Sequence, residues 1–262
     1  MQSRSDGNDG FTVAAVSLAA MSVVTFDHEA LGHGGVCVAS GGHIRLLTSS
    51  MFLCDPGSAW IAAAGPICNL LAGVVALWLV RVVPRRFASW RLLLILVTCF
   101  GFYWESGYVI MAMYTREGDL YLAGQGLLGE PSLWWRIVAG AAGIGLYLFT
   151  SRWAVRSFSM LWPDPAIALR RARLAWTAAT LGSAFAAMTC PGVGRGNVQD
   201  AVLEIGVASF PLLLLRHRQQ MTQIQPGSGG VPNDRIAIGL ALLVYAIFAA
   251  TLGYGMHYPL GH

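Results

Sequence analysis

Charged side chains are scarce in this sequence, and lysine is absent from it. Only 11% of the 262 residues are charged, whereas 55% are hydrophobic. Soluble domains average about 25% charged residues, so this composition argues against an ordinary soluble enzyme and indicates a polytopic membrane protein. All 17 basic residues are arginines. They lie between apolar runs rather than in one patch interleaved with aromatics, which argues against a nucleic-acid partner.

Cysteine motifs are also missing. The five cysteines form no C-x-x-C pair, which excludes a ribbon-type zinc site and a thioredoxin-like redox motif. Cys37 and Cys54 leave two interpretations open. They form a disulfide if their side of the membrane is oxidising, or they are two separate cysteines buried in apolar surroundings.

Long apolar runs are plentiful, and each is close to the length that crosses a hydrocarbon core of about 30 Å. They are Phe11–Val38, Ser58–Val83, Leu92–Tyr114, Leu133–Thr150, Leu174–Cys190, Val198–Leu215 and Ile236–Met256. The sequence therefore predicts an all-α polytopic membrane protein with about seven transmembrane helices. We expect one membrane-embedded domain over residues 1–262.

The first two runs are separated by Gly41–Gly57, which is too polar to cross a membrane. Ile44–Leu53 within it is rich in apolar and β-branched residues, so we expect a short β-hairpin there. The first run is interpreted as a membrane span rather than a cleaved signal peptide. Its leading residues hold only Arg4 against two aspartates, and cleavage near Ala39 would remove the polar cluster described below.

The arginines are distributed unevenly between the two sides of the predicted membrane. One set of alternate connections holds Arg4, Arg81, Arg85, Arg86, Arg91, Arg152, Arg156, Arg170, Arg171, Arg173, Arg216, Arg218 and Arg235. The other set holds Arg45, Arg116, Arg136 and Arg195. The positive-inside rule then predicts a cytoplasmic N-terminus and an outer hairpin, in an integral protein of a bacterial inner membrane.

The stretch Phe26–Gly35, with the sequence FDHEALGHGG, ends the first apolar run. It contains His28, Glu29 and His33. Charged and imidazole side chains at membrane depth are costly and rare, which makes this cluster a candidate functional site. Histidine-glutamate followed shortly by histidine is typical of zinc hydrolases, in which the imidazoles bind the metal and the glutamate handles the proton of the water.

The spacing of the two histidines requires a distorted helix. They are five residues apart, about 500° around a regular α-helix, which leaves them about 140° out of line. A π-bulge would return both to one face, and Gly32, Gly34 and Gly35 make such a distortion, or local unwinding, inexpensive. The alternative is a pair of interfacial histidines that cap a helix near water.

A site with two histidines needs a third ligand, usually an acidic one. Glu105 in the third apolar run and Asp119 in the following connection are the candidates, with His43 behind them. Glu29 is the candidate general base. Asp27 either hydrogen-bonds a ligand imidazole or is merely interfacial.

Two other acidic residues lie in the sixth apolar run. Asp200 and Glu204 pair with arginines, line a cavity or sit at the interface, and we do not assign them to the site.

One family resemblance brings these features together. A histidine-glutamate pair near the end of the first span, a β-like insertion and Ala-Gly-Pro-x-x-Asn opening the next span resemble the site-2 protease family of intramembrane zinc metalloproteases. The resemblance covers a metalloprotease-like core over residues 1–127 and leaves residues 128–262 as additional transmembrane helices. It implies that His28, His33 and Asp119 bind zinc and that Glu29 activates water. The motif here is H-E-x-x-x-H, with one residue more than the usual H-E-x-x-H.

The second motif lies at the start of the second span. Gly65, Pro66 and Asn69 match the Gly-Pro-x-x-Asn element of that family, which implies that they bind substrate and that the asparagine helps to hold an unwound segment. The alternative is simple helix packing, because small residues are frequent where membrane helices approach closely.

The sequence as a whole predicts an intramembrane zinc metallopeptidase. Its substrate would be a membrane protein or peptide within the lipid bilayer. Two alternatives stay open: a membrane metal-binding or scaffold protein without proteolytic activity, and a zinc hydrolase that acts on a lipid or small molecule. Glu29 favours hydrolysis, because a purely structural metal site needs no base.

Overall fold

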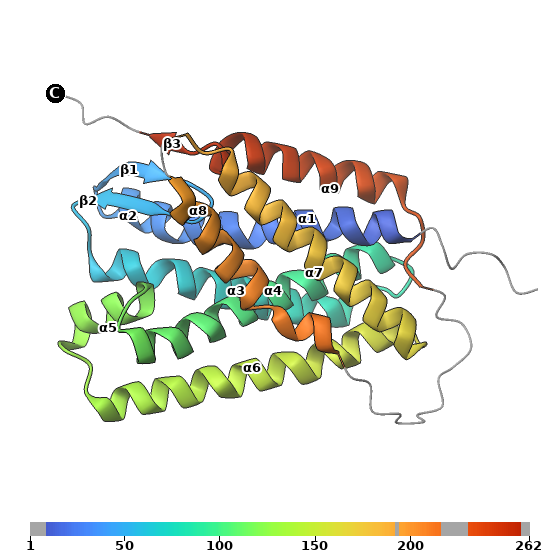
Figure 1. Cartoon of the computed structure of the whole chain (residues 1–262), viewed down its shortest axis with the longest axis horizontal. Coiled ribbons are helices and arrows are strands. Elements are labelled where there is room, and N and C mark those ends of the chain that lie inside the picture. The colour runs from blue at the N-terminus through green and yellow to red at the C-terminus, as the bar shows by residue number, and fades with distance from the viewer. Residues whose placement is uncertain (1–8, 192–193, 216–229, 258–262) are drawn as a thin grey trace, which may run out of the picture.

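A computed structural model describes residues 9–191, 194–215 and 230–257 of the chain. Most of these residues are helical, and the long helices run along the longest axis of the molecule (Figure 1). The all-α prediction is thereby confirmed, with one small sheet in addition. Arg4, Arg216 and Arg218, on which part of the orientation prediction depends, lie outside the described residues.

The first half of the chain holds the elements that carry the polar cluster. They are α1 (Gly10–Phe26), the π-helix η1 (Asp27–Gly34), α2 (Gly35–Ala39), β1 (His43–Leu47), β2 (Phe52–Asp55), α3 (Ala59–Val82), α4 (Ala88–Thr115) and α5 (Asp119–Leu128). The second half holds α6 (Leu133–Leu161), α7 (Pro165–Met188), α8 (Gly194–Ala201), the π-helix η2 (Val202–Val207), the 3-10 helix η3 (Phe210–Leu214), α9 (Arg235–Phe248), the π-helix η4 (Ala249–Gly253) and β3 (Met256–His257).

Five helices of the described residues are long and apolar enough to cross a membrane. They are Gly10–Ala39, Ala59–Val82, Ala88–Thr115, Leu133–Leu161 and Arg235–Gly253. They correspond to the first four expected spans and to the seventh, so the count of seven is not confirmed.

The fifth and sixth expected spans differ from these five for physical reasons. The fifth lies in α7, which is a long helix, but its apolar part begins only after Arg173 and is short for a membrane crossing. The sixth is divided among α8, η2 and η3. Pro211 lies in η3 and has no N–H to continue an α-helical hydrogen-bond ladder.

The predicted hairpin is confirmed. β1 pairs antiparallel with β2, and β3 from the far end of the chain pairs with the other edge of β1. Cys37 at the end of the first span forms a disulfide with Cys54 on β2, so the disulfide interpretation of these cysteines holds. The hydroxyl groups of Thr48 and Ser50 donate hydrogen bonds to Asn197 of α8, which ties the hairpin turn to the second half of the chain.

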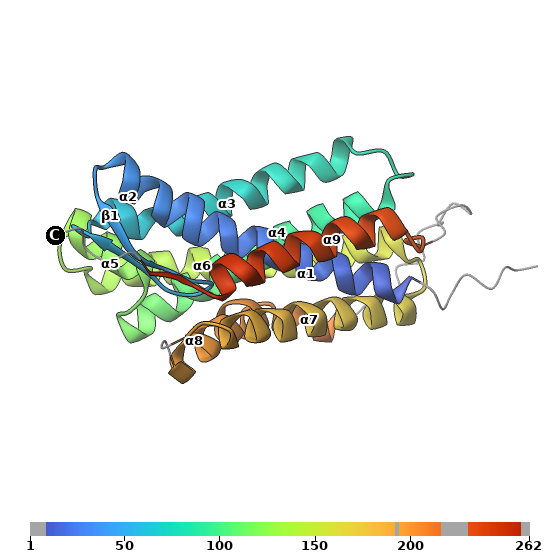
Figure 2. The ribbon, with the colours of Figure 1, turned by 90° about the horizontal axis from the view of Figure 1, so that it is seen from above.

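The core is centred on α4, which contacts α1, α3 and α6. Its Phe100, Tyr103 and Trp104 are fully buried. α7 and α8 lie on one side of α1 and α3 lies on the other (Figure 2). The sheet, α2 and α5 gather at one end of the bundle, which is the end that carries the polar cluster (Figure 1).

Candidate metal centre

The helix around the two histidines is a π-helix, as the spacing predicts. η1 covers Asp27–Gly34 and continues α1 without a break. Its i→i+5 hydrogen bonds bring residues five apart toward the same side. The rings of His28 and His33 accordingly lie 4.8 Å apart between centroids, at an interplanar angle of 77°. Both side chains are buried, with 1% and 4% of their surface exposed.

Asp119, the first residue of α5, completes the cluster. Its Oδ2 lies 3.4 Å from Nε2 of His28 and 3.5 Å from Nε2 of His33. One ligand atom from each of the three residues lies within 4.8 Å of the others, so the group could hold a metal ion. Gly118 places the carboxylate there, because its φ of 87° turns the chain into α5. Of the two acidic candidates, Asp119 is therefore the one that faces both Nε2 atoms.

The charge state of Asp119 suits a metal ligand. Burial by itself would raise the pKa of this carboxyl group. In the metal-free protein, hydrogen bonds from the Nε2 atoms of His28 and His33 outweigh that effect and hold the pKa well below its usual range. A bound cation would replace these protons and would also favour the ionised carboxylate. The carboxylate is therefore ionised near neutral pH.

The distances from Asp119 to the two imidazoles are long for hydrogen bonds and leave room for an ion between the side chains. Zinc with bonds of about 2.0–2.1 Å keeps its ligand atoms about 3.4 Å apart, whereas N–H···O contacts are usually about 2.7–3.2 Å. The observed 3.4 and 3.5 Å match the first value. Gly65 of α3 leaves the space open, because a Cβ at this position would lie 2.7 Å from Nε2 of His28 and closer still to Nε2 of His33.

The Nδ1 atoms of both histidines face acceptors. Nδ1 of His28 lies 3.1 Å from Oε1 of Glu105, and Nδ1 of His33 lies 2.6 Å from the carbonyl oxygen of Ile61. A proton on each Nδ1 leaves the Nε2 lone pairs directed at the space beside Asp119.

Glu29 lies in the same buried cluster of titratable side chains. Only 3% of its surface is exposed, and its carboxylate interacts electrostatically with His28, His33 and Asp119. Its Oε2 has no hydrogen-bond partner within the described residues. A buried carboxylate oxygen without a partner is costly, so this atom is available to a water molecule or a substrate.

Two of the weaker candidates stand apart from the cluster. His43 is exposed on β1, opposite Asp55 of β2. Asp27 interacts electrostatically with His28, but in the described part of the chain it makes no hydrogen bond to either imidazole.

The second motif lies directly against the histidines. Gly65, Pro66 and Asn69 are buried on α3. Nδ2 of Asn69 lies 2.8 Å from Oε1 of Glu105 and 3.1 Å from Nδ1 of His28. The structure thus brings these residues together with the histidine cluster. The substrate contacts implied for them stay a prediction.

Several neighbours of the site escape the sequence patterns. Trp104 stacks on His28 at 4.4 Å, and Phe52 of the hairpin stacks on His33 at 5.5 Å. Glu204 of η2, which the sequence analysis leaves outside the site, is buried, accepts a hydrogen bond from Tyr108 and interacts electrostatically with Glu29. Its position as an acidic residue in an apolar run is the one signal that marks it.

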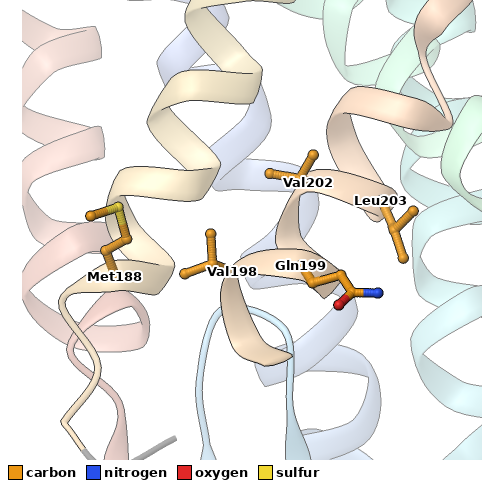
Figure 3. A pocket seen from close by; sticks show the side chains of 5 residues that line it. All are labelled: Met188, Val198, Gln199, Val202 and Leu203. Atoms are coloured by element: carbon orange, nitrogen blue, oxygen red, sulfur yellow. The ribbon is translucent and has the colours of Figure 1, made fainter. Parts of the chain in front are cut away.

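An apolar hollow of about 520 Å³ lies elsewhere, between the end of α7, α8 and η2. Met188, Val198, Gln199, Val202 and Leu203 line it (Figure 3). None of these side chains belongs to the metal centre, and none is titratable.

Comparisons of the chain with protein-family models, with curated proteins and with solved structures find no match.

Proposed function

We propose that this protein is an intramembrane zinc metallopeptidase that hydrolyses a peptide bond of a membrane-associated protein or peptide. The observation that carries the proposal is the spacing of 3.4 and 3.5 Å between Oδ2 of Asp119 and the two histidine Nε2 atoms. It is supported by Oε2 of Glu29 in the same buried cluster, which has no hydrogen-bond partner among the residues that the structure describes. A structural metal site would have no use for this fourth group.

Each residue of the cluster has a defined task in this proposal. His28, His33 and Asp119 hold the zinc. A zinc ion held there would supply Lewis acidity toward a substrate carbonyl and would lower the pKa of a water molecule. Glu29 takes the proton of the attacking water and delivers it to the leaving amine. Asn69, Gly65 and Pro66 lie next to the histidines, where an unwound substrate segment would have to pass.

We further propose that the site opens toward the outer side of a bacterial inner membrane, with a cytoplasmic N-terminus. The arginine distribution supports this orientation. The disulfide between Cys37 and Cys54 supports it as well, because it lies at the site's end of the bundle and disulfides persist in oxidising compartments.

The test is a metal analysis of the detergent-purified full-length protein together with a peptidase assay. We expect about one zinc per wild-type chain, by the stoichiometry of a catalytic site. The zinc should be lost in His33→Ala and in Asp119→Ala and kept in Glu29→Gln. The assay uses quenched-fluorescent peptides that carry an apolar helical segment, reconstituted with the enzyme in lipid vesicles.

Three outcomes would contradict the proposal. A well-folded wild-type protein without metal would exclude a metal-dependent hydrolase. Loss of metal and fold together in Glu29→Gln would favour a structural metal site in a scaffold protein. Cleavage of the vesicle lipids but of no peptide would indicate the lipid hydrolase instead.

A further inference from the structure

Glu105 is the most deeply placed acidic residue beside the metal centre, and it is not one of the three clustered ligands. It lies inside the third membrane span on α4, with 1% of its surface exposed. Such a position is costly for a carboxylate unless hydrogen bonds satisfy it. Its Oε1 has two close polar neighbours, Nδ2 of Asn69 at 2.8 Å and Nδ1 of His28 at 3.1 Å. Its Oε2 is buried and has no hydrogen-bond partner among the described residues, so the satisfied oxygen is the one that faces His28.

Nδ1 of His28 faces two partners of opposite character. Oε1 of Glu105 accepts hydrogen bonds, whereas Nδ2 of Asn69, 3.1 Å away, donates them. A neutral imidazole carries one N–H. If Nδ1 accepted a hydrogen bond from Asn69, the proton would sit on Nε2 and would point at Asp119, so His28 could not bind a metal. If Nδ1 donates to Glu105, the Nε2 lone pair is free.

The two histidines differ in what determines which ring nitrogen carries the proton. Nδ1 of His33 donates to a backbone carbonyl, that of Ile61, and needs no side chain to fix its proton. Nδ1 of His28 depends on a side chain. Helix α4 also fixes the plane of the His28 ring, because Trp104 stacks on it with an interplanar angle of 12°. Trp104 and Glu105, which are adjacent on α4, thus contact the face and the Nδ1 edge of the His28 ring.

We infer that Glu105 is a positioning residue that keeps the proton of His28 on Nδ1 and so presents Nε2 to the metal. Asn69 acts through Glu105, because its amide donates to the same carboxylate oxygen. This inference rests on the proposed metal centre but not on peptidase activity. Partners of this kind typically change metal affinity by about 10–100-fold when they are removed.

The experiment is a zinc titration against a competing chelator, with the detergent-purified full-length protein. We expect Glu105→Ala to bind zinc about 10–100-fold more weakly while the stoichiometry stays at that of the wild type. Glu105→Gln should lose less, because an amide oxygen still accepts from Nδ1, and it carries the test if Glu105→Ala does not fold. Ser106→Ala is the control. Ser106 is the next residue on α4 and is equally buried, but within the described ranges its hydroxyl donates to the carbonyl of Phe102 and to no residue of the metal centre.

A double-mutant cycle separates this network from simple packing. Asn69→Ala should weaken zinc binding by itself and should add little in the Glu105→Ala background, because both residues act through one hydrogen-bonded network. The absorption spectrum of the cobalt-substituted protein should shift in Glu105→Ala, because the His28 ring is reoriented.

Defined results would overturn the inference. Equal zinc affinities of Glu105→Ala and the wild type would exclude a positioning role. Loss of stoichiometric metal in Glu105→Ala, with retention in Asp119→Ala, would make Glu105 the third ligand instead. Additive effects in the cycle would separate Asn69 from Glu105. A wild-type protein that binds no zinc would overturn the proposed function and this inference together. Failure of the inference alone would leave zinc binding of the wild type intact.

Discussion

Gly32 of the π-helix and Gly65 of α3 meet through their backbones. A Cβ on Gly32 would lie 2.6 Å from Cα of Gly65 and 2.9 Å from the carbonyl oxygen of Ala64. This contact lets α3 approach the π-helix closely enough for Gly65 to face the histidine Nε2 atoms and for Asn69 to reach His28. The close helix packing that the sequence offers as one alternative for this motif is therefore present, and it brings the motif against the histidines, whereas the substrate contacts stay a prediction.

Substitutions at three glycines should separate packing from metal binding. Gly65→Ala should lose zinc, because its methyl group occupies the space between the Nε2 atoms. Gly32→Ala should destabilise the fold by about 1–3 kcal/mol, the usual effect of overpacking. Gly35→Ala is the matched control, since nothing lies within 4 Å of its Cβ. Zinc content and detergent melting curves measure both effects, and full zinc retention in Gly65→Ala would contradict the assigned geometry.

Zinc should stabilise the folded protein only through His28, His33 and Asp119. A ligand that binds only the folded state stabilises it by about 2.7 kcal/mol at a concentration 100-fold above its dissociation constant. We expect added zinc to raise the melting temperature of the chelator-treated wild type and to leave that of His28→Ala and Asp119→Ala unchanged. His43→Ala is the control, because His43 is exposed on the sheet and should respond like the wild type. An equal zinc response in all variants would indicate unspecific binding.

The sequence predicts those features of the site that depend on residues close together in the chain, and it does not predict those that depend on residues far apart. The five-residue spacing of His28 and His33 predicts a distorted helix if both bind one ion, either a π-bulge or local unwinding, and the structure has the π-helix. The choice between Glu105 and Asp119 is a tertiary matter, because their partners are 77 and 91 residues away along the chain. The sequence leaves both as candidates for the third ligand and does not predict which imidazole nitrogen each one faces.

The fifth and sixth expected spans differ from the structure because apolar composition alone does not show where a helix begins or is interrupted. The run that begins at Leu174 extends from an arginine-rich helical turn, so α7 is longer and more polar than the expected span. The run that holds Glu204 is interrupted by a π-helix and by Pro211. Glu204 reaches the neighbourhood of Glu29 only because this broken segment packs against α4 and α7.

The orientation can be tested through the disulfide. In intact spheroplasts, a membrane-impermeant maleimide should label a Cys68→Ser protein only after an impermeant reductant has opened the bond between Cys37 and Cys54. Cys99 and Cys190 are buried and should contribute little. A protein in which Cys37 and Cys54 are both serine should stay unlabelled under the same conditions. Labelling only after permeabilisation would place the hairpin in the cytoplasm and would contradict the proposed orientation.

The role of Glu29 can be separated from that of buried charge in general. Glu29→Gln keeps the shape of the side chain but cannot take a proton, so we expect kcat to fall by about 10²–10⁴ while zinc is retained. Glu204→Gln is the matched control, because Glu204 is an equally buried acid near Glu29 and lies outside the ligand cluster. It should keep its zinc and lose much less activity. Equal losses of kcat in the two variants would mean that the buried negative charge matters rather than proton transfer, and Glu29 would then not be the base.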